Sequence, residues 1–235
     1  PWEEARVALQ KNFDIQAQAT AGPALARAGI VVWAVKPQTF KDAAAQAREH
    51  TQHALHLSVA AGIRSDSISQ WLGSDCIVRT MPNTPALVGK GMSALYARAG
   101  VSAAQRQSVE AIMATTGEFL WVNDEQQLDA VTALSGSGPA YVFYFLEAMA
   151  RAGTAMGLTP AQAHQLAVGT YVGASELARQ SDESPQVLRQ RVTSKGGTTY
   201  AALQSMEQDG VGEAFVRAMQ AAQQRAHELG NEFGA

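Results

Sequence analysis

The chain has 235 residues, of which 17% are charged and 46% are hydrophobic, and its formal net charge is −3. This length and composition indicate a folded protein with room for two domains and exclude a disordered chain. The small negative charge gives no electrostatic reason to expect a nucleic acid or an anionic membrane as partner.

The first half of the sequence alternates between helical and strand-like segments. Helices are expected over residues 5–13, 23–28, 39–50 and 65–72, and again from Ser102, which forms a capping box pattern with Gln105. Strands are expected over residues 30–35, 55–59, 76–81, 93–97 and 119–122. The apolar run 30–35 is typical of a strand buried on both faces of a parallel sheet. We therefore expect a doubly wound, Rossmann-like α/β domain over residues 1–123.

Only helices are expected beyond residue 123. They cover residues 125–134, 139–156, 160–181, 185–191, 198–208 and 211–233, and Thr159 with Gln162 forms a second capping box pattern. Small residues such as Gly153, Gly169 and Gly173 permit close helix packing, either inside one chain or in an intertwined dimer. The sequence predicts an all-helical domain over residues 124–235.

The single cysteine and the acidic residues offer no metal site. Cys76 alone excludes a disulfide framework and a thiolate zinc site, and its apolar neighbours predict a small buried side chain. Asp124, Glu125 and Asp129 are expected to cap and solvate a helix start rather than to bind a metal ion. Because no signal peptide and no run of about 18 apolar residues is present, we expect a cytoplasmic protein without a membrane span.

The carboxyl ends of three expected strands carry small residues and prolines. Ligands of open parallel sheets bind outside such ends, where small side chains let a ring or a pyrophosphate lie against the backbone. The segments are Ala34-Val35-Lys36-Pro37, Val59-Ala60-Ala61-Gly62 and Met81-Pro82-Asn83-Thr84-Pro85. Together they predict a nucleotide crevice, in which Lys36 is either a charge beside phosphates or a solvated turn residue.

A glycine turn before the helix at Thr198 predicts a carboxylate site. Gly196 and Gly197 let several backbone N–H groups converge at the helix start, and Thr198 and Thr199 add hydroxyl groups. Between Ser184 and Met206 the charged residues are Arg189, Arg191 and Lys195, all positive. The alternative is an ordinary helix start with solvated cations.

A second glycine run, Ser135-Gly-Ser-Gly-Pro139, resembles a nucleophile elbow only superficially. An elbow needs different glycine spacing, a preceding strand and histidine and acid partners, and none of these accompanies the run. The run instead predicts a kink between two helices, with Ser137 capping the helix that begins at Pro139.

At these positions the chain resembles pyrroline-5-carboxylate reductases. The matching segments are Ala34-Val-Lys-Pro37, Ser58-Val-Ala-Ala-Gly62, Arg79-Thr-Met-Pro-Asn-Thr-Pro85, Asp129-Ala-Val-Thr-Ala-Leu-Ser-Gly-Ser-Gly-Pro-Ala-Tyr141 and Val192-Thr-Ser-Lys-Gly-Gly-Thr-Thr199. The resemblance implies a Rossmann domain and a helical domain that interlocks with a partner's, giving homodimers that can assemble into decamers. It also implies hydride transfer from NADPH or NADH to 1-pyrroline-5-carboxylate, with L-proline as product. Of the two cofactors we favour NADPH, although the sequence does not contain the segment that sets the preference.

The resemblance also implies roles for individual residues. Cofactor contacts are expected from Ala34, Val35, Lys36, Pro37, Val59, Ala60, Ala61, Asn83 and Arg191. Substrate contacts are expected from Glu125, Thr132, Ser137, Ser194, Gly197, Thr198 and Thr199. The Thr199 hydroxyl is the candidate catalytic group, because a donor at the imine nitrogen makes the ring carbon more electrophilic.

One departure from the family pattern concerns the start of the chain. The family begins with a strand, a glycine-rich phosphate loop, a helix and a second strand. None of these precedes residue 1, so we expect that the natural protein has a further N-terminal segment. Two alternative functions stay open: a reductase of the hydroxyacid dehydrogenase type, and a non-catalytic chain that binds a ligand or dimerises.

Overall fold

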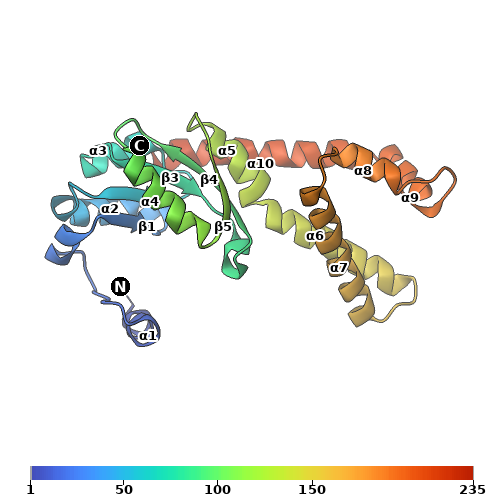
Figure 1. Cartoon of the computed structure of the whole chain (residues 1–235), viewed down its shortest axis with the longest axis horizontal. Helices are drawn as coiled ribbons and strands as arrows, with labels where there is room; N and C mark the ends of the chain where they lie inside the picture. The colour runs from blue at the N-terminus through green and yellow to red at the C-terminus, as the bar shows by residue number, and fades with distance from the viewer. Residues whose placement is uncertain (1, 235) are drawn as a thin grey trace. The chain divides into compact units, whose positions relative to one another are not determined.

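The computed structural model describes residues 2–234 (Figure 1). The chain divides into two compact units: the first runs to Gly136 and resumes at Ala222, and the second is Ser137–Ala221. Residue 123, where the sequence places a domain boundary, does follow the last strand. The first unit nevertheless includes the next segment, because that segment packs on the sheet, and it includes the C-terminal end of the chain.

A five-stranded sheet in the order β1-β2-β3-β4-β5 forms the centre of the first unit. The strands are β1 (Ile30–Trp33), β2 (Leu55–Ser58), β3 (Ile77–Met81), β4 (Gly91–Ala97) and β5 (Gly117–Trp121). Neighbouring strands run parallel except for β3 and β4, which are antiparallel. This antiparallel pair departs from the parallel arrangement that is typical of a doubly wound sheet. Residues 82–90, which connect these strands, are too few for the crossover of about a dozen residues that a parallel pair needs.

The helices of the first unit lie close to the predicted positions in the sequence. They are α1 (Glu3–Phe13), η1 (Pro23–Arg27), α2 (Pro37–Ala47), η2 (Arg48–His50), α3 (Ser65–Leu72), η3 (Thr84–Val88), α4 (Ala103–Ala114), α5 (Gln127–Val131) and the π-helical turn η4 (Thr132–Gly136). The capping box of Ser102 and Gln105 is confirmed, with both of its hydrogen bonds present. The single helix expected over residues 125–134 is instead α5 followed by η4.

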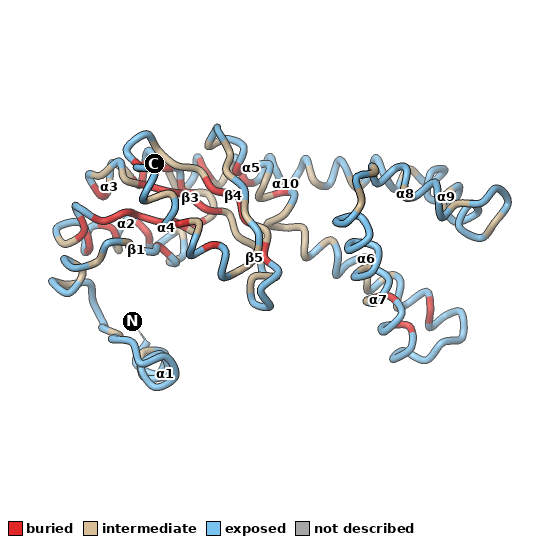
Figure 2. Tube along the Cα trace, in the orientation of Figure 1, coloured by how far each residue is buried: buried red, intermediate tan, exposed pale blue. Residues whose placement is uncertain are grey.

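The buried side chains of the first unit form two clusters, one on each face of the sheet. One cluster contains Trp33 and Phe40 with residues of α2 and α3, and the other contains Leu57 and Val78 with residues of α4. Buried residues are concentrated in this unit in Figure 2. Two burial predictions are wrong: Val32 is 51% exposed, and Cys76 is half-buried, since it lies just before β3.

The second unit consists of helices that match the predicted bounds within about two residues. They are α6 (Gly138–Ala155), α7 (Pro160–Gln180), α8 (Pro185–Arg191), α9 (Thr198–Gln208) and the first part of α10 (Val211–Phe233). The Thr159 and Gln162 capping box is confirmed. The capping role of Ser137 is wrong, because its backbone is already helical and its side chain makes no cap hydrogen bond.

Few residues of the second unit are buried, as the pale helices of Figure 2 show. Gly153, Ala163 and Ala167 are its buried residues within the described chain. An ideal Cβ on Gly153 would lie 3.0 Å from the Ala163 Cβ, so α6 and α7 pack closely there. By contrast, Gly169 and Gly173 have no neighbouring atom within 4 Å of such a Cβ. Within residues 2–234, no helix has the length and hydropathy that crossing a bilayer requires.

Candidate active site

The carboxyl ends of β1, β2 and β3 lie next to one another at one edge of the sheet. Trp33 pairs with Ser58, and Ser58 pairs with Arg79 on the following strand. The backbone N–H of Val59 also donates to the Trp33 carbonyl at 3.1 Å. Residues 34–37, 59–61 and 82–83 continue directly from these strands, so the structure brings together the cofactor residues predicted in the first unit.

Small and accessible side chains occupy this edge. Ala34 and Lys36 are exposed, Val35 and Pro37 are half-buried, and Ala60 is 6% exposed. Pro37 starts α2, and Lys36 precedes it without a side-chain cap. The Lys36 ammonium forms no ion pair or hydrogen bond within residues 2–234. The edge therefore fits a flat, phosphate-bearing ligand, which small side chains and an unpaired cation would accommodate.

Asn83 has both ends of its side-chain amide engaged. Its Nδ2 donates to the Ser135 carbonyl at 3.1 Å, and its Oδ1 accepts from the Met92 backbone N–H at 3.0 Å. These bonds connect the end of β3 to β4 and to the π-helical turn η4. The predicted cofactor contact of Asn83 stays a prediction, and the structure adds a structural function for the same side chain.

The Glu125 carboxylate lies at the centre of a charged network before α5. Its Oε1 accepts from the Ser65 backbone N–H and from Arg79 Nη1, both at 2.6 Å, and its Oε2 accepts from the Ser65 hydroxyl at 2.5 Å. Because Ser65 is the first residue of α3, the carboxylate also interacts favourably with the N-terminus of that helix. Glu125 therefore stabilises the first unit, whereas its predicted substrate contact stays a prediction.

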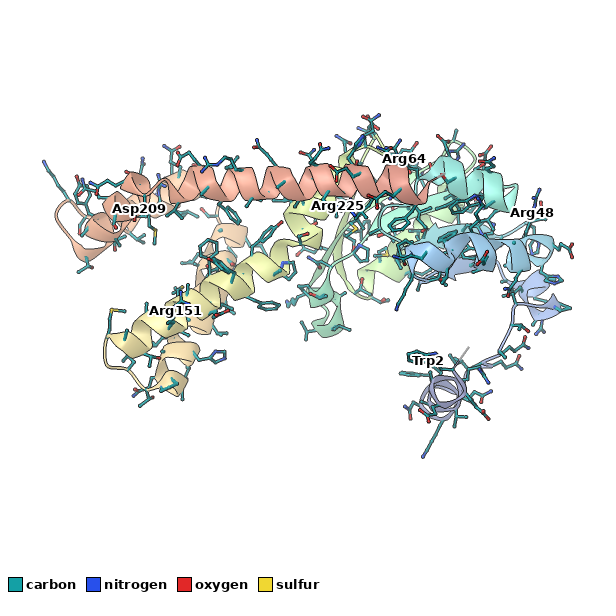
Figure 3. The ribbon with its side chains drawn as sticks, turned by 180° about the vertical axis from the view of Figure 1, so that it is seen from behind. Trp2, Arg48, Arg64, Arg151, Asp209 and Arg225 are labelled. Atoms are coloured by element: carbon teal, nitrogen blue, oxygen red, sulfur yellow. The ribbon has the colours of Figure 1, made fainter. Side chains whose placement is uncertain are left out.

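A polar cavity of about 250 Å³ adjoins this network within the first unit. It is lined by Gly62, Arg64, Asp66, Arg79, Tyr96, Asp124, Glu125, Gln126, Asp129 and Gly230. One lining residue is Arg64, which is labelled in Figure 3. Its Nη2 donates to Asn231 Oδ1 of α10 at 2.8 Å. Of the residues predicted for substrate or cofactor, only Glu125 lines this cavity.

The anion site expected at the glycine turn before α9 stays a prediction, and the structure gives the geometry of the turn. The Gly197 N–H donates to the Ser194 carbonyl at 3.0 Å, and Gly196 has a φ of +74°, which favours glycine. Gly197 is the N-cap of α9 and provides no side-chain cap. The N–H groups of the first turn of α9 are therefore open to a ligand, and the adjacent Thr198 and Thr199 are exposed.

The net positive charge near this turn is smaller than the charged residues between Ser184 and Met206 indicate. Arg191 Nη2 donates to Glu183 Oε1 at 2.6 Å, although its side chain remains 67% exposed. Glu183 lies just outside the run from Ser184 to Met206, so counting charges in that run missed it. Arg189 and Lys195 have no ion pair within residues 2–234 and still give the turn a positive character.

Two further predicted substrate residues belong to the segment that joins the units. The Thr132 hydroxyl donates to the Leu128 carbonyl at 2.7 Å, which leaves its oxygen able to accept another hydrogen bond. Ser137 is half-buried at the start of α6. The remaining predicted residues are divided between the units, with Arg191, Ser194 and Gly197–Thr199 in the second.

Arg79 is the residue that sequence reasoning missed. It lies 8% exposed in the middle of β3, where a charged side chain requires a partner. Arg98, at the end of β4, donates to Asp66, to Asp75 and to the Ser65 hydroxyl, and so extends the same network. An arginine inside the apolar run 76–81 was the available signal, because a buried arginine predicts a carboxylate close by.

Comparison with known proteins gives the family of the chain. The profile described as pyrroline-5-carboxylate reductase dimerisation matches residues 125–229. A pyrroline-5-carboxylate reductase of Pseudomonas aeruginosa is 43% identical over 238 residues, which cover 100% of this chain and 86% of the relative. This chain belongs to the pyrroline-5-carboxylate reductase family.

Solved pyrroline-5-carboxylate reductase structures share the fold. One from Coxiella burnetii is 36% identical, has a TM-score of 0.87 and aligns over 95% of this chain and 84% of its own. A Plasmodium falciparum pyrroline carboxylate reductase with NADP bound is 29% identical, has a TM-score of 0.84 and aligns over 93% and 87%. Membership of the reductase family favours neither the hydroxyacid dehydrogenase nor the non-catalytic alternative.

Proposed function

We propose that this protein reduces the C=N bond of 1-pyrroline-5-carboxylate to give L-proline, the last step of proline synthesis. The observation that carries the proposal is the open N-terminus of α9, where Gly197 leaves the first-turn N–H groups free beside two exposed threonines. A carboxylate is the anion that such a helix start favours. The substrate has one carboxylate, next to a ring that contains the imine.

The residues of this turn account for the binding and activation that the reaction needs. The N–H groups of Thr198 and Thr199 bind the carboxylate, and this contact fixes the ring. The Thr199 hydroxyl then lies at the ring nitrogen and polarises the imine. The nitrogen takes up a proton as the ring carbon gains the hydride. Ser194 and Ser137, both in the second unit, supply further polar contacts. A substrate contact of Thr132, in the first unit, stays a prediction, and no covalent enzyme intermediate is required.

We further propose that the hydride donor is NADPH in preference to NADH, bound along the carboxyl ends of β1, β2 and β3. The bound nucleotide supplies the hydride. Ala34, Val35, Pro37 and Val59–Ala61 provide the small surface on which it lies, and Lys36 faces its negative charge. Support comes from the exposure of Ala34 and Lys36 and from the Plasmodium falciparum relative, which was solved with NADP.

We propose a homodimer as the functional unit and a decamer of five dimers as its larger assembly. Large apolar side chains of the second unit are open to solvent: Phe143 63%, Tyr144 69%, Leu166 58%, Val172 66% and Leu177 69% exposed. Such a surface favours burial against a second copy. Light scattering after size-exclusion chromatography distinguishes the monomer, dimer and decamer. For the same enzyme we propose a cytoplasmic location, which cell fractionation tests.

The deciding experiment is a turnover assay of the full-length protein on 1-pyrroline-5-carboxylate with NADPH and, in parallel, with NADH. We expect nucleotide oxidation together with proline formation, and a larger kcat/KM with NADPH. A panel of 2-hydroxy acids with oxidised nucleotide serves as the control for the dehydrogenase alternative. Turnover of a hydroxyacid without turnover of the imine would contradict the proposal, as would a protein that binds no nucleotide in calorimetry.

A further inference from the structure

The Ser135 carbonyl does not accept the backbone hydrogen bond that it would accept in an α-helix. In an α-helix this carbonyl would accept from the N–H of residue 139, but residue 139 is proline and has no N–H. The next N–H, that of Ala140, donates instead to the Ser137 carbonyl at 3.0 Å. The π-helical turn η4 therefore presents a backbone acceptor that must be satisfied from another part of the chain.

Asn83 satisfies that acceptor, since its Nδ2 lies 3.1 Å from the Ser135 oxygen. The oxygen of the same side-chain amide extends the hydrogen bonding between β3 and β4. Met81 pairs with Ala94 as the last pair of the β3 and β4 ladder, and the same register places Asn83 opposite Met92. The Asn83 Oδ1 accepts from the Met92 N–H at 3.0 Å, as a backbone carbonyl of the strand would do.

The contact at Gly136 holds the same turn against the end of β3. A Cβ on Gly136 would lie 2.5 Å from the Met81 Cε, so a side chain at residue 136 would displace that methionine. One hydrogen bond and the space left by Gly136 thus let the turn lie beside the carboxyl end of β3. This is the edge at which open α/β sheets bind their ligands.

We infer that Asn83 is a positioning residue for the reduction, and that it acts through the Ser135 carbonyl on the turn that carries Thr132 and leads to Ser137. The inference rests on the proposed function. Asn83 holds η4 beside the end of β3, and so places the Thr132 hydroxyl relative to the carboxyl ends of β1, β2 and β3, where the nucleotide is proposed to bind. Displacement of reacting groups by about 1 Å lowers turnover by roughly a hundredfold.

Asn83→Asp tests this inference, because it keeps the acceptor for Met92 and removes the donor for Ser135. At neutral pH we expect kcat to fall by about tenfold or more, while the dissociation constant for NADPH stays within about threefold of wild type. As the pH is lowered, protonation of the new carboxyl restores an O–H donor. The ratio of wild-type to variant kcat should therefore shrink toward acidic pH.

Hydrogen exchange gives a readout that does not depend on activity. In Asn83→Asp we expect faster amide exchange in peptides that cover residues 132–140, and unchanged exchange at Met92. The matched control is Gln52→Glu, since the Gln52 amide donates to the carbonyls of Arg48 and Leu72 at 3.1 and 3.3 Å, away from the strand ends. Its kcat should equal that of wild type.

Three results would overturn the inference. One is a wild-type kcat in Asn83→Asp, and the second is weaker NADPH binding with an unchanged kcat, which would make Asn83 a cofactor contact only. The third is unchanged exchange over residues 132–140. Failure of the proposed function has a different signature, because wild-type protein would then leave 1-pyrroline-5-carboxylate unreduced while the exchange experiment still tests the Asn83 contact.

Discussion

Arg79 Nη1 lies 2.6 Å from Glu125 Oε1, and the two side chains are only 9% and 18% exposed. The same carboxylate accepts two hydrogen bonds from Ser65. One acidic side chain therefore joins β3, the start of α3 and the segment before α5. A buried charge that loses its partner is left in a medium of low dielectric. Removal of either side chain is therefore expected to lower the free energy of unfolding by more than the ion pair contributes to it.

Glu125→Gln tests this relationship. Glutamine keeps the size of the side chain and removes its charge, so the Arg79 guanidinium remains buried and uncompensated. We expect a loss of about 3 kcal/mol in the free energy of unfolding, measured by urea denaturation followed by circular dichroism. The control is Arg225→Met on α10, whose ion pairs with Glu228 and Glu232 lie at the surface and should contribute little. Equal midpoints for Glu125→Gln and wild type would contradict the structural role.

A buried histidine in β2 predicts a loss of stability in acid. Burial lowers the pKa of His56 to about 4, partly opposed by a hydrogen bond with the Thr51 backbone. Its Nδ1 also accepts a hydrogen bond from Trp33 Nε1 at 3.1 Å, which only the neutral ring can do in this arrangement. Because the pKa is lower in the folded state, the stabilisation is complete above the unfolded value of about 6.5 and decreases as the pH falls toward 4.

The expected decrease from this one group is about 3 kcal/mol between pH 6.5 and pH 4. Urea denaturation at a series of pH values measures it, and His56→Gln should flatten the profile over that interval. His53→Gln alters an exposed histidine on the turn before β2 and should leave the wild-type profile in place. If His56→Gln and wild type lost stability in parallel with falling pH, the histidine would not be the group responsible.

Local signals explain which features were predictable. Helices α8, α9 and α10 begin and end where proline, glycine and apolar spacing place them, because caps and periodicity are properties of neighbouring residues. Alternation of strands and helices predicts parallel neighbours, so it does not indicate the antiparallel direction of β4. The signal for it is the short connection of residues 82–90, which has too few residues for the crossover of a parallel pair.

The candidate site also contains features that depend on neighbouring residues and features that depend on residues far apart in the chain. The open start of α9 follows from Gly196 and Gly197, which adjoin Thr198 in the chain. The bond from Asn83 to Ser135 spans 52 positions, and the bond from Arg79 to Glu125 spans 46. Such contacts depend on how β3 meets the segment after β5, and a single sequence holds no record of that. Pro139 did indicate that the Ser135 carbonyl lacked a helical partner, but not which residue would replace it.

The Thr199 hydroxyl is expected to act at the ring nitrogen of the substrate. Thr199→Ala should lower kcat by about tenfold to a hundredfold and leave the melting temperature unchanged, because the exposed hydroxyl stabilises no other part of the described chain. Steady-state kinetics with 1-pyrroline-5-carboxylate measure the effect, and Thr199→Ser should restore most of the activity. Thr193→Ala is the control, since the Thr193 hydroxyl donates to the Arg189 carbonyl at 2.6 Å within its own turn. A Thr199→Ala enzyme with wild-type kcat would remove the hydroxyl from the mechanism.

The close approach at Gly197 predicts a defect in substrate binding rather than in turnover. A Cβ at this position would lie 2.6 Å from the Ser194 Oγ and 3.2 Å from the Ser194 carbonyl oxygen. Gly197 has a φ of −81°, which any residue adopts, so the effect of a side chain is steric rather than conformational. Gly197→Val should displace Ser194 and narrow the approach to the N–H groups of α9.

We therefore expect the KM for 1-pyrroline-5-carboxylate to rise by about tenfold, with a smaller change in kcat and an unchanged KM for the nucleotide. Gly212→Ala on α10 is the matched control, because a Cβ there meets no atom within 4 Å. Inhibition by proline provides a second measure, since the product has the same carboxylate and should bind more weakly to Gly197→Val. If both the KM and the proline inhibition constant stayed within twofold of wild type, the substrate carboxylate would bind elsewhere than at the start of α9.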